Sequence, residues 1–197
     1  MIDIGANVGS TSVLLGDTFQ RAILFEPNPV AAARSRENLC LNKLSFEIEE
    51  IALSDVSGTV EFEDIGGTSS TNRVVVGFRS SANTRIVPRI TFDQHLLDRN
   101  LTLPSGTIVK IDVEGHENAV LRGMQNFLRV GRPRLVMFEY LQRTNLSETR
   151  QIFDQVGYVV FRLCEHGPVL AELQVKPLQN LFACPIELQT EFGLMES

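Results

Sequence analysis

Four acidic residues each follow an apolar run of the kind that forms a buried strand. They are Asp3, Glu26, Asp112 and Glu139. In an open α/β sheet, ligands bind at the carboxyl ends of the strands, near the point where the strand order reverses. Because all four carboxylates would reach that edge, the sequence predicts a ligand site there.

A turn punctuated by glycine follows the first of these strands. Gly5 and Gly9 permit close backbone approach, and Asn7 between them tolerates left-handed geometry. A helix-like stretch follows Gly9, so the turn presents backbone N–H groups and a helix N-terminus to a nucleotide-like ligand. Glu26 ends the second strand, 17 residues past Gly9, where a carboxylate can accept hydrogen bonds from ribose hydroxyls. The alternative for Asp3 and Gly5 is an ordinary strand-to-helix turn.

The spacing of this turn does not fit the common nucleotide fingerprints. A G-x-G-x-x-G motif read from Gly5 would need glycine at Asn7 and fails again at Ser10, and no Walker lysine follows. An acidic residue two positions before the first glycine, as Asp3 is here, is instead typical of S-adenosylmethionine sites. There the loop approaches the methionine portion of the cofactor rather than a pyrophosphate.

A second group of ionisable residues follows the apolar run Thr107–Val113. Asp112, Glu114, His116 and Glu117 provide four such groups within six residues. If the strand persists through Glu114, side-chain alternation puts Asp112 and Glu114 on the same side. A carboxylate or imidazole there could take a proton from an alcohol, and His116 is the best single candidate by its ordinary pKa. A capping or surface role for His116 is the alternative, while Glu117 is expected in the first turn of a helix.

A divalent metal is a further option at this edge. Its oxygen and nitrogen ligands could come from Asp112, Glu114, His116 and Glu139. The Asp-x-x-Lys arrangement of catechol-type metal-dependent methyltransferases is absent, because Gly115 stands where that lysine would be. We therefore expect no catalytic metal. Lys110, within an apolar strand, is expected to pair with a neighbouring carboxylate.

Apolar runs alternate with helical patterns, and these elements must position the site. The expected strands are Ile2–Ile4, Ala22–Phe25, Phe46–Leu53, Thr59–Glu63, Ile86–Ile90, Thr107–Val113, Leu135–Phe138, Tyr158–Leu163 and Leu178–Ala183. Strands separated by helices imply a mostly parallel sheet with helices on both faces. The last two strands, joined without a helix, would add an antiparallel edge strand. The Gly-, Ser- and Thr-rich stretch 66–85 is expected to be a loop, and part of it could cover an acceptor.

Composition narrows the class of protein. The chain has 197 residues, 43% hydrophobic and 21% charged, which favours one globular domain. A net charge of −6 argues against nucleic-acid binding. We expect no membrane span, because no run approaches ~18–20 apolar residues, and no signal peptide is visible. Three cysteines without a CxxC motif argue against a disulfide framework and a zinc site, so we expect a reduced, cytoplasmic protein.

Four sequence blocks together carry a resemblance to a known family. They are Asp3–Gly9, Glu26–Pro29, Ala52–Asp55 and Lys110–Glu117. In this order they resemble the signature blocks of FkbM-type S-adenosylmethionine-dependent methyltransferases, over Met1 to about Tyr140. The resemblance implies an α/β fold with a three-layer, Rossmann-like class I methyltransferase sheet. That sheet has seven strands and is mostly parallel, with the terminal strand inserted antiparallel.

The resemblance also implies roles at the methionine end of the cofactor. Asp3, Gly5, Asn7 and Gly9 would line this end of S-adenosylmethionine, with Asp3 near its ammonium group. Asp112, at the end of its strand, would lie beside the place where the methyl group is transferred.

The ribose and adenine of the cofactor would be held by two further blocks. Glu26 would hold the ribose diol, and Pro27 would lie against the adenine. Ala52 and Leu53, which follow the third strand, would complete the adenine pocket, partly through backbone groups.

We therefore expect an S-adenosylmethionine-dependent methyltransferase that acts on a hydroxyl oxygen. Alignment of the acceptor with the S–CH3 bond would supply much of the catalysis, and the candidate catalytic residues are Asp112, Glu114 and His116. The resemblance implies a small-molecule or glycan acceptor, such as a sugar, a glycolipid or a polyketide-like natural product. Nothing in the sequence selects among these acceptors or sets the oligomeric state.

Two other functions stay open at this stage. The first predicted strand has about three residues before Gly5, whereas a strand typically has ~5–6. We therefore expect residues 1–197 to form a single methyltransferase domain with further sequence before Met1, and a truncated or non-catalytic Rossmann-like module is one alternative. An NAD-dependent oxidoreductase is the other, and the glycine spacing disfavours it.

Overall fold

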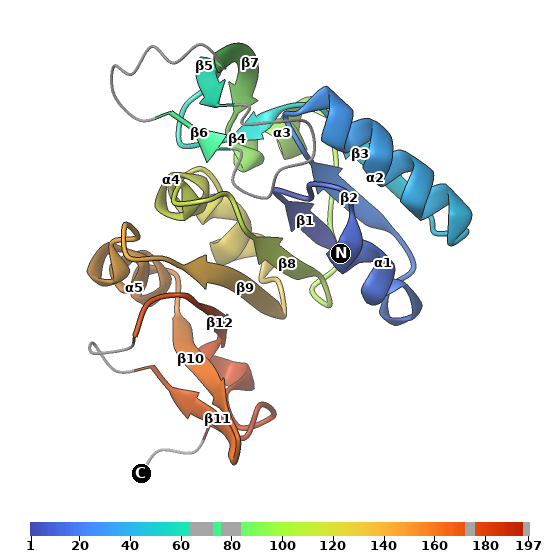
Figure 1. Cartoon of the computed structure of the whole chain (residues 1–197). Coiled ribbons are helices and arrows are strands. Elements are labelled where there is room, and N and C mark those ends of the chain that lie inside the picture. Colours follow the sequence, from blue (N-terminus) through green and yellow to red (C-terminus); the bar gives the residue numbers. More distant parts are fainter. Residues whose placement is uncertain (64–72, 76–83, 172–175, 195–197) are drawn as a thin grey trace.

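The structure is a computed structural model that describes residues 1–63, 73–75, 84–171 and 176–194. It has the predicted α/β class, with two sheets and helices packed around the larger one (Figure 1). Most of the loop expected over 66–85 lies outside the described residues.

The larger sheet has eight strands in the order β11-β10-β12-β9-β8-β1-β2-β3. Their bounds are β1 Ile2–Ile4, β2 Ala22–Phe25, β3 Phe46–Glu49, β8 Ile108–Ile111, β9 Leu135–Tyr140, β10 Tyr158–Cys164, β11 Gly167–Leu170 and β12 Gln179–Pro185. The pairs from β3 through β9 are parallel, and β12 pairs antiparallel with both β9 and β10. From β1 the chain adds β2 and β3 on one side of the sheet and then returns to add β8 and β9 on the other side. The strand order therefore reverses at β1.

The terminal strands differ in one respect from the expected edge hairpin. The predicted antiparallel pairing of β10 with the last strand, β12, is confirmed. The family resemblance implied that the terminal strand is inserted antiparallel, and β12 is indeed inserted between β9 and β10. The edge is formed instead by β11, which makes a hairpin with β10. The short run Gly167–Leu170 is half exposed or exposed, so its apolar pattern is too weak to predict a strand.

Helices cover both faces of this sheet, which makes three layers (Figure 1). On one face lie α1 (Ser10–Leu14) and α2 (Pro29–Leu41), packed over a cluster that contains Leu24 and Leu39. On the other lie α3 (Phe92–Asp98), α4 (Glu117–Arg122) and α5 (Leu146–Gln155), packed on the main core. A π-helical turn at Phe127–Gly131 and 3-10 turns at Gly16–Thr18 and Ile186–Leu188 complete the helical segments of the described ranges. None of these helices is both long and apolar enough to cross a lipid bilayer.

The smaller sheet lies at the top of the molecule in Figure 1, on the side of α3 and α4. Its strands are, in spatial order, β4 Ala52–Leu53, β7 Thr84–Ile90, β5 Gly58–Glu63 and β6 Arg73–Val74. The prediction of one strand over Phe46–Leu53 is therefore wrong. β3 pairs with β2 in the large sheet, whereas β4 pairs with the end of β7 in the small one. The chain leaves the large sheet after Glu49 and enters the small sheet at Ala52. Ala52 and Leu53 therefore lie next to the carboxyl ends of the large sheet's strands, where the site is predicted.

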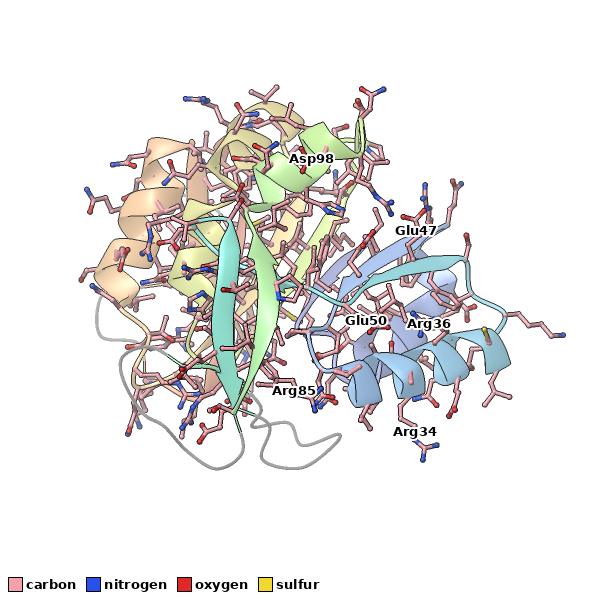
Figure 2. All side chains as sticks on the ribbon, turned by 90° about the horizontal axis from the view of Figure 1, so that it is seen from above. Arg34, Arg36, Glu47, Glu50, Arg85 and Asp98 are labelled. Carbon is pink, nitrogen blue, oxygen red and sulfur yellow. The ribbon has the colours of Figure 1, made fainter. Side chains whose placement is uncertain are left out.

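The start of α2 is fixed by a local cap. Pro29 occupies the first turn, as predicted, and the Asn28 side chain accepts a hydrogen bond from the Val30 N–H at 2.9 Å. Figure 2 shows Arg34 and Arg36 on opposite sides of the helix, with Arg36 on the side of Glu50, from which it lies 3.5 Å away. The buried side of α2 meets the sheet, since Leu39 packs in one cluster with Leu24 of β2, and the capped end of the helix holds the chain that follows β2.

Candidate functional site

A cavity of about 270 Å³ opens at the carboxyl ends of β1, β2, β8 and β9. Most of the predicted site residues line it, namely Gly5, Asn7, Glu26, Pro27, Ala52, Leu53, Asp112, Glu114 and His116. Phe62 and Val74 of the small sheet form part of the wall, and no sequence pattern had linked them to the site. The four predicted sequence blocks therefore meet around one space, which we call the first cavity.

The turn after β1 requires glycine at its first position. Gly5 has a φ of +72°, and a Cβ atom there would lie 1.9 Å from the backbone oxygen of Asp112. Asn7 adopts a φ of 48°, in the left-handed region predicted for it. Gly9, with a φ of +76°, is buried away from the cavity wall, and a Cβ atom there would lie 2.5 Å from the Ser35 hydroxyl. Gly5 thus permits the approach of β8, and Gly9 permits the approach of α2.

Glu26 lies at the end of β2 with both carboxylate oxygens held by the backbone. Oε2 accepts a hydrogen bond from the Asn7 N–H at 2.8 Å, and Oε1 accepts one from the Asn28 N–H at 2.9 Å. The residue is 6% exposed, and it lines the first cavity. Burial raises its pKa above the usual value, while the two N–H groups oppose the rise. Each oxygen keeps further lone-pair capacity, so a vicinal diol in the cavity can donate to a carboxylate whose orientation is already fixed.

Asp3 lies beneath the turn rather than on the cavity wall. Its side chain is 0% exposed; Oδ2 accepts a hydrogen bond from the Ser12 hydroxyl at 2.7 Å, and Oδ1 lies 3.2 Å from Lys110 Nζ. The predicted pairing of Lys110 with a carboxylate is confirmed. Burial lowers the pKa of Lys110, but the charges of Asp3 and Asp112 outweigh it and hold the pKa above its usual value. Strand register explains the pairing, because Asp3 and Lys110 are direct neighbours in β1 and β8.

Three carboxylates converge on one side of the first cavity. Asp112, Glu114 and Glu139 each place an oxygen within 4.8 Å of the others. The predicted strand alternation does not explain why Asp112 and Glu114 lie close together, because β8 ends at Ile111, before both residues. Glu114 instead has a left-handed backbone conformation, with a φ of 56°. Burial, followed by the charges of Asp112 and Glu114, raises the pKa of Glu139 to about 7. Oxygen ligands in this number suit a divalent cation, and His116 lies outside the set.

Glu117 holds the loop that carries these carboxylates. It is the first residue of α4, as predicted, but it is fully buried. Its Oε1 accepts hydrogen bonds from the N–H groups of Gly115 at 2.9 Å and Val113 at 3.3 Å. Burial raises the pKa of Glu117, and the Gly115 N–H opposes the rise. The residue therefore fixes the left-handed loop between β8 and α4.

His116 occupies the cap position of α4 and also lines the first cavity. Its Nε2 atom lies 3.0 Å from the hydroxyl oxygen of Ser54, at the end of β4. Burial lowers the pKa of His116 to about 4, so its imidazole is neutral at pH 7. His116 thus occupies the predicted cap position and also lines the first cavity, but its lowered pKa removes the reason for which it was favoured as a base.

Comparisons of the sequence with known proteins identify a family and a relative. The sequence model of the methyltransferase FkbM domain matches residues 3–160. The hexuronic acid methyltransferase AglP of Haloferax volcanii is 32% identical over 128 residues, which are 64% of this chain and 50% of that protein. The chain thus spans about half the length of the curated relative it matches.

Two solved structures are similar to this chain, each at 14% sequence identity. Precorrin 8W decarboxylase of Methanobacterium thermoautotrophicum has a TM-score of 0.46, with 92% of this chain and 77% of that one covered. The small RNA methyltransferase HEN1 has a TM-score of 0.49, with 100% of this chain and 24% of that one covered.

Proposed function

The chain belongs to the methyltransferase FkbM domain family, and from this we propose that it transfers a methyl group from S-adenosylmethionine to a hydroxyl oxygen of a sugar. The observation that carries the proposal is Glu26, whose carboxylate is held by two backbone N–H groups at the edge of the first cavity. The relative named as a hexuronic acid methyltransferase supports a sugar as the acceptor.

The residues that line the first cavity suit the proposed cofactor in their position and charge. Glu26 would accept hydrogen bonds from the ribose diol, and the adenine would lie among Pro27, Ala52 and Leu53, which line the same space. Within the described ranges, the charged residues on the wall are four acids and one base, namely Glu26, Asp112, Glu114, Glu139 and Arg73. An acidic wall favours a ligand that carries a sulfonium and an ammonium group.

Asp3 and Gly9 would act on the cofactor indirectly. Asp3 binds Lys110, and Lys110 Nζ donates to the carbonyl oxygen of Gly5 at 2.9 Å. Gly9 allows the start of α1 to pack against Ser35 of α2. We propose that these two residues set the shape of the turn, while Gly5 and Asn7 contact the methionine end.

For catalysis, we propose that Glu139 takes the proton of the acceptor hydroxyl. When bound, S-adenosylmethionine supplies a methyl group on a positively charged sulfur. The Glu139 carboxylate would accept the proton that the acceptor hydroxyl loses as its oxygen takes up the methyl group, and the sulfur would keep the electron pair of the S–CH3 bond. A base with a pKa near 7 suits this task at neutral pH, and the Glu139 pKa is raised to about 7. Asp112 and Glu114 would sustain that shift, and His116, with its pKa near 4, would contact the acceptor as a neutral group.

Calorimetry on the purified chain tests the cofactor proposal. Titration with S-adenosylhomocysteine and, separately, with NAD should give binding of the first only. Binding of NAD alone would overturn the methyltransferase proposal, and binding of neither would favour a non-catalytic module. Transfer of labelled methyl groups from S-adenosylmethionine to sugars then tests the reaction itself.

A further inference from the structure

A second cavity of about 460 Å³ adjoins the first. It lies among the small sheet, α4 and the residues around the start of α5, and it shares Val74 and His116 with the first cavity. The shared residues line the first cavity together with Glu139, the carboxylate that we propose for proton transfer. A molecule in the second cavity could therefore present a hydroxyl group at the point where the two spaces meet.

The charges on the two cavity walls are of opposite sign. Among the residues that the structure describes, three arginines and two carboxylates line the second cavity, namely Arg89, Arg122, Arg143, Asp55 and Glu148. The wall of the second cavity therefore has one more positive than negative charge. On the described part of the first cavity's wall, acids outnumber the single arginine. The second cavity therefore suits a ligand with a single negative charge.

Arg89 is the arginine of this wall whose charge is left for a ligand. Arg122 contacts the carboxylate of Asp55 at 2.9 Å and also that of Glu148, while Arg143 lies 2.9 Å from Glu114. No carboxylate of the described ranges lies within 4.0 Å of the Arg89 guanidinium, and its Nε atom is buried without a hydrogen-bond partner. Because Arg89 lines the second cavity and its guanidinium carries five N–H donors, it can donate to an oxyanion bound there.

The position of Arg89 is fixed by the sheet that carries it. It lies in β7, where it is the register neighbour of Ala52 in β4 and of Gly58 in β5. A strand with partners on both sides holds its side chains more firmly than a loop does. The charge of Arg89 also acts on His116, which lies on the boundary between the two cavities.

We propose that Arg89 binds the carboxylate of the acceptor, so that the substrate is a uronic-acid sugar with its carboxylate in the second cavity and a hydroxyl group in the first. This inference rests on the proposed methyltransferase function. A guanidinium matches a planar carboxylate through two parallel hydrogen bonds. A phosphate dianion fits less well, because the wall offers one excess positive charge and also carries Asp55 and Glu148.

The test compares matched acceptors on the chain saturated with S-adenosylhomocysteine. Three ligands are titrated by calorimetry: the methyl glycoside of glucuronic acid (the glucuronide, with a free carboxylate), methyl glucoside (the glucoside) and glucose 6-phosphate. The proteins compared are wild type, Arg89→Met, Arg89→Lys and the control Arg129→Met. Arg129 is exposed and lies outside both cavities. Circular dichroism checks that each variant folds.

We expect the glucuronide to bind wild type more tightly than the glucoside. Arg89→Met should weaken glucuronide binding by about 10- to 100-fold, while Arg129→Met leaves it unchanged and Arg89→Lys retains part of it. Equal binding of glucuronide and glucoside, or unchanged glucuronide binding in Arg89→Met, would overturn the inference. So would tighter binding of glucose 6-phosphate than of the glucuronide. Failure of S-adenosylhomocysteine to bind at the outset would instead count against the proposed function.

Discussion

Lys110 and Asp3 form a buried ion pair directly beneath the turn that follows β1. Their charged atoms are 3.2 Å apart, and the two side chains are 6% and 0% exposed. Lys110 also donates to the carbonyl oxygen of Gly5. The pair therefore joins two parallel strands of the sheet to the backbone of the proposed cofactor loop.

Removal of the lysine should destabilise the fold. Lys110→Met leaves Asp3 as a buried carboxylate without its cation, and loss of one partner of a buried ion pair costs about 3–5 kcal/mol. Urea unfolding followed by circular dichroism measures the change. The double variant Asp3→Asn with Lys110→Met should regain part of the loss. A double variant as unstable as the sum of the two single ones would contradict the pairing.

Glu26→Ala should weaken binding of S-adenosylhomocysteine by about 10- to 100-fold, because hydrogen bonds to a charged group are lost. Calorimetry gives the dissociation constant. Glu37→Ala is the control, since Glu37 lies exposed on α2 in an ion pair with Arg34. Equal affinity of the Glu26 variant and wild type would show that the ribose site has been misplaced.

Glu139→Gln should lower kcat by about 10²- to 10⁴-fold, the usual contribution of a general base. The affinity for S-adenosylhomocysteine should stay close to that of wild type. In wild type, kcat should rise as the pH increases through about 7, because Glu139 loses its proton there. Glu61→Gln, a change at an exposed position in β5, should leave both quantities unchanged. A Glu139 variant with wild-type kcat would assign the proton transfer elsewhere.

His116 should make the stability of the chain depend on pH. Its pKa is about 4 in the folded chain, against an ordinary value of 6.5. Below pH 6.5 the unfolded chain therefore binds a proton that the folded chain does not, and the free energy of unfolding falls as the pH is lowered towards 4. The full effect is about 3 kcal/mol.

His116→Asn removes this contribution. Unfolding in urea at pH 7 and at pH 5 should show a smaller loss of stability in the variant than in wild type. The same loss in both proteins would mean that His116 is protonated in the folded chain.

The meeting of Gly5, Asn7 and Glu26 at one cavity could be predicted because these three residues are local in sequence. Gly5, Asn7 and Glu26 belong to one strand-helix-strand unit, whose geometry follows from short-range backbone rules. The parallel pairing of β1 with β2 then brings the turn and the carboxylate together. Nothing beyond this unit is needed for the Asn7 N–H to reach Glu26.

The other half of the site depends on contacts that are distant in sequence. Glu139 joins Asp112 because β9 lies next to β8, and Glu114 joins them through a left-handed backbone conformation. Arg89 reaches the second cavity only because the chain changes sheets after Glu49 and builds β4 against β7. A hydrophobic pattern cannot show a change of sheet, since the apolar runs on either side of it look the same.

The placement of β12 has a consequence for biosynthesis. This strand, Gln179–Pro185, fills the space between β9 and β10, yet a ribosome makes it after both of them. Until it arrives, the emerging polypeptide carries two unpaired strand edges, and such edges are templates for aggregation. We therefore expect nascent chains of this protein to be prone to aggregation until Gln179–Pro185 has left the ribosome and paired with β9 and β10.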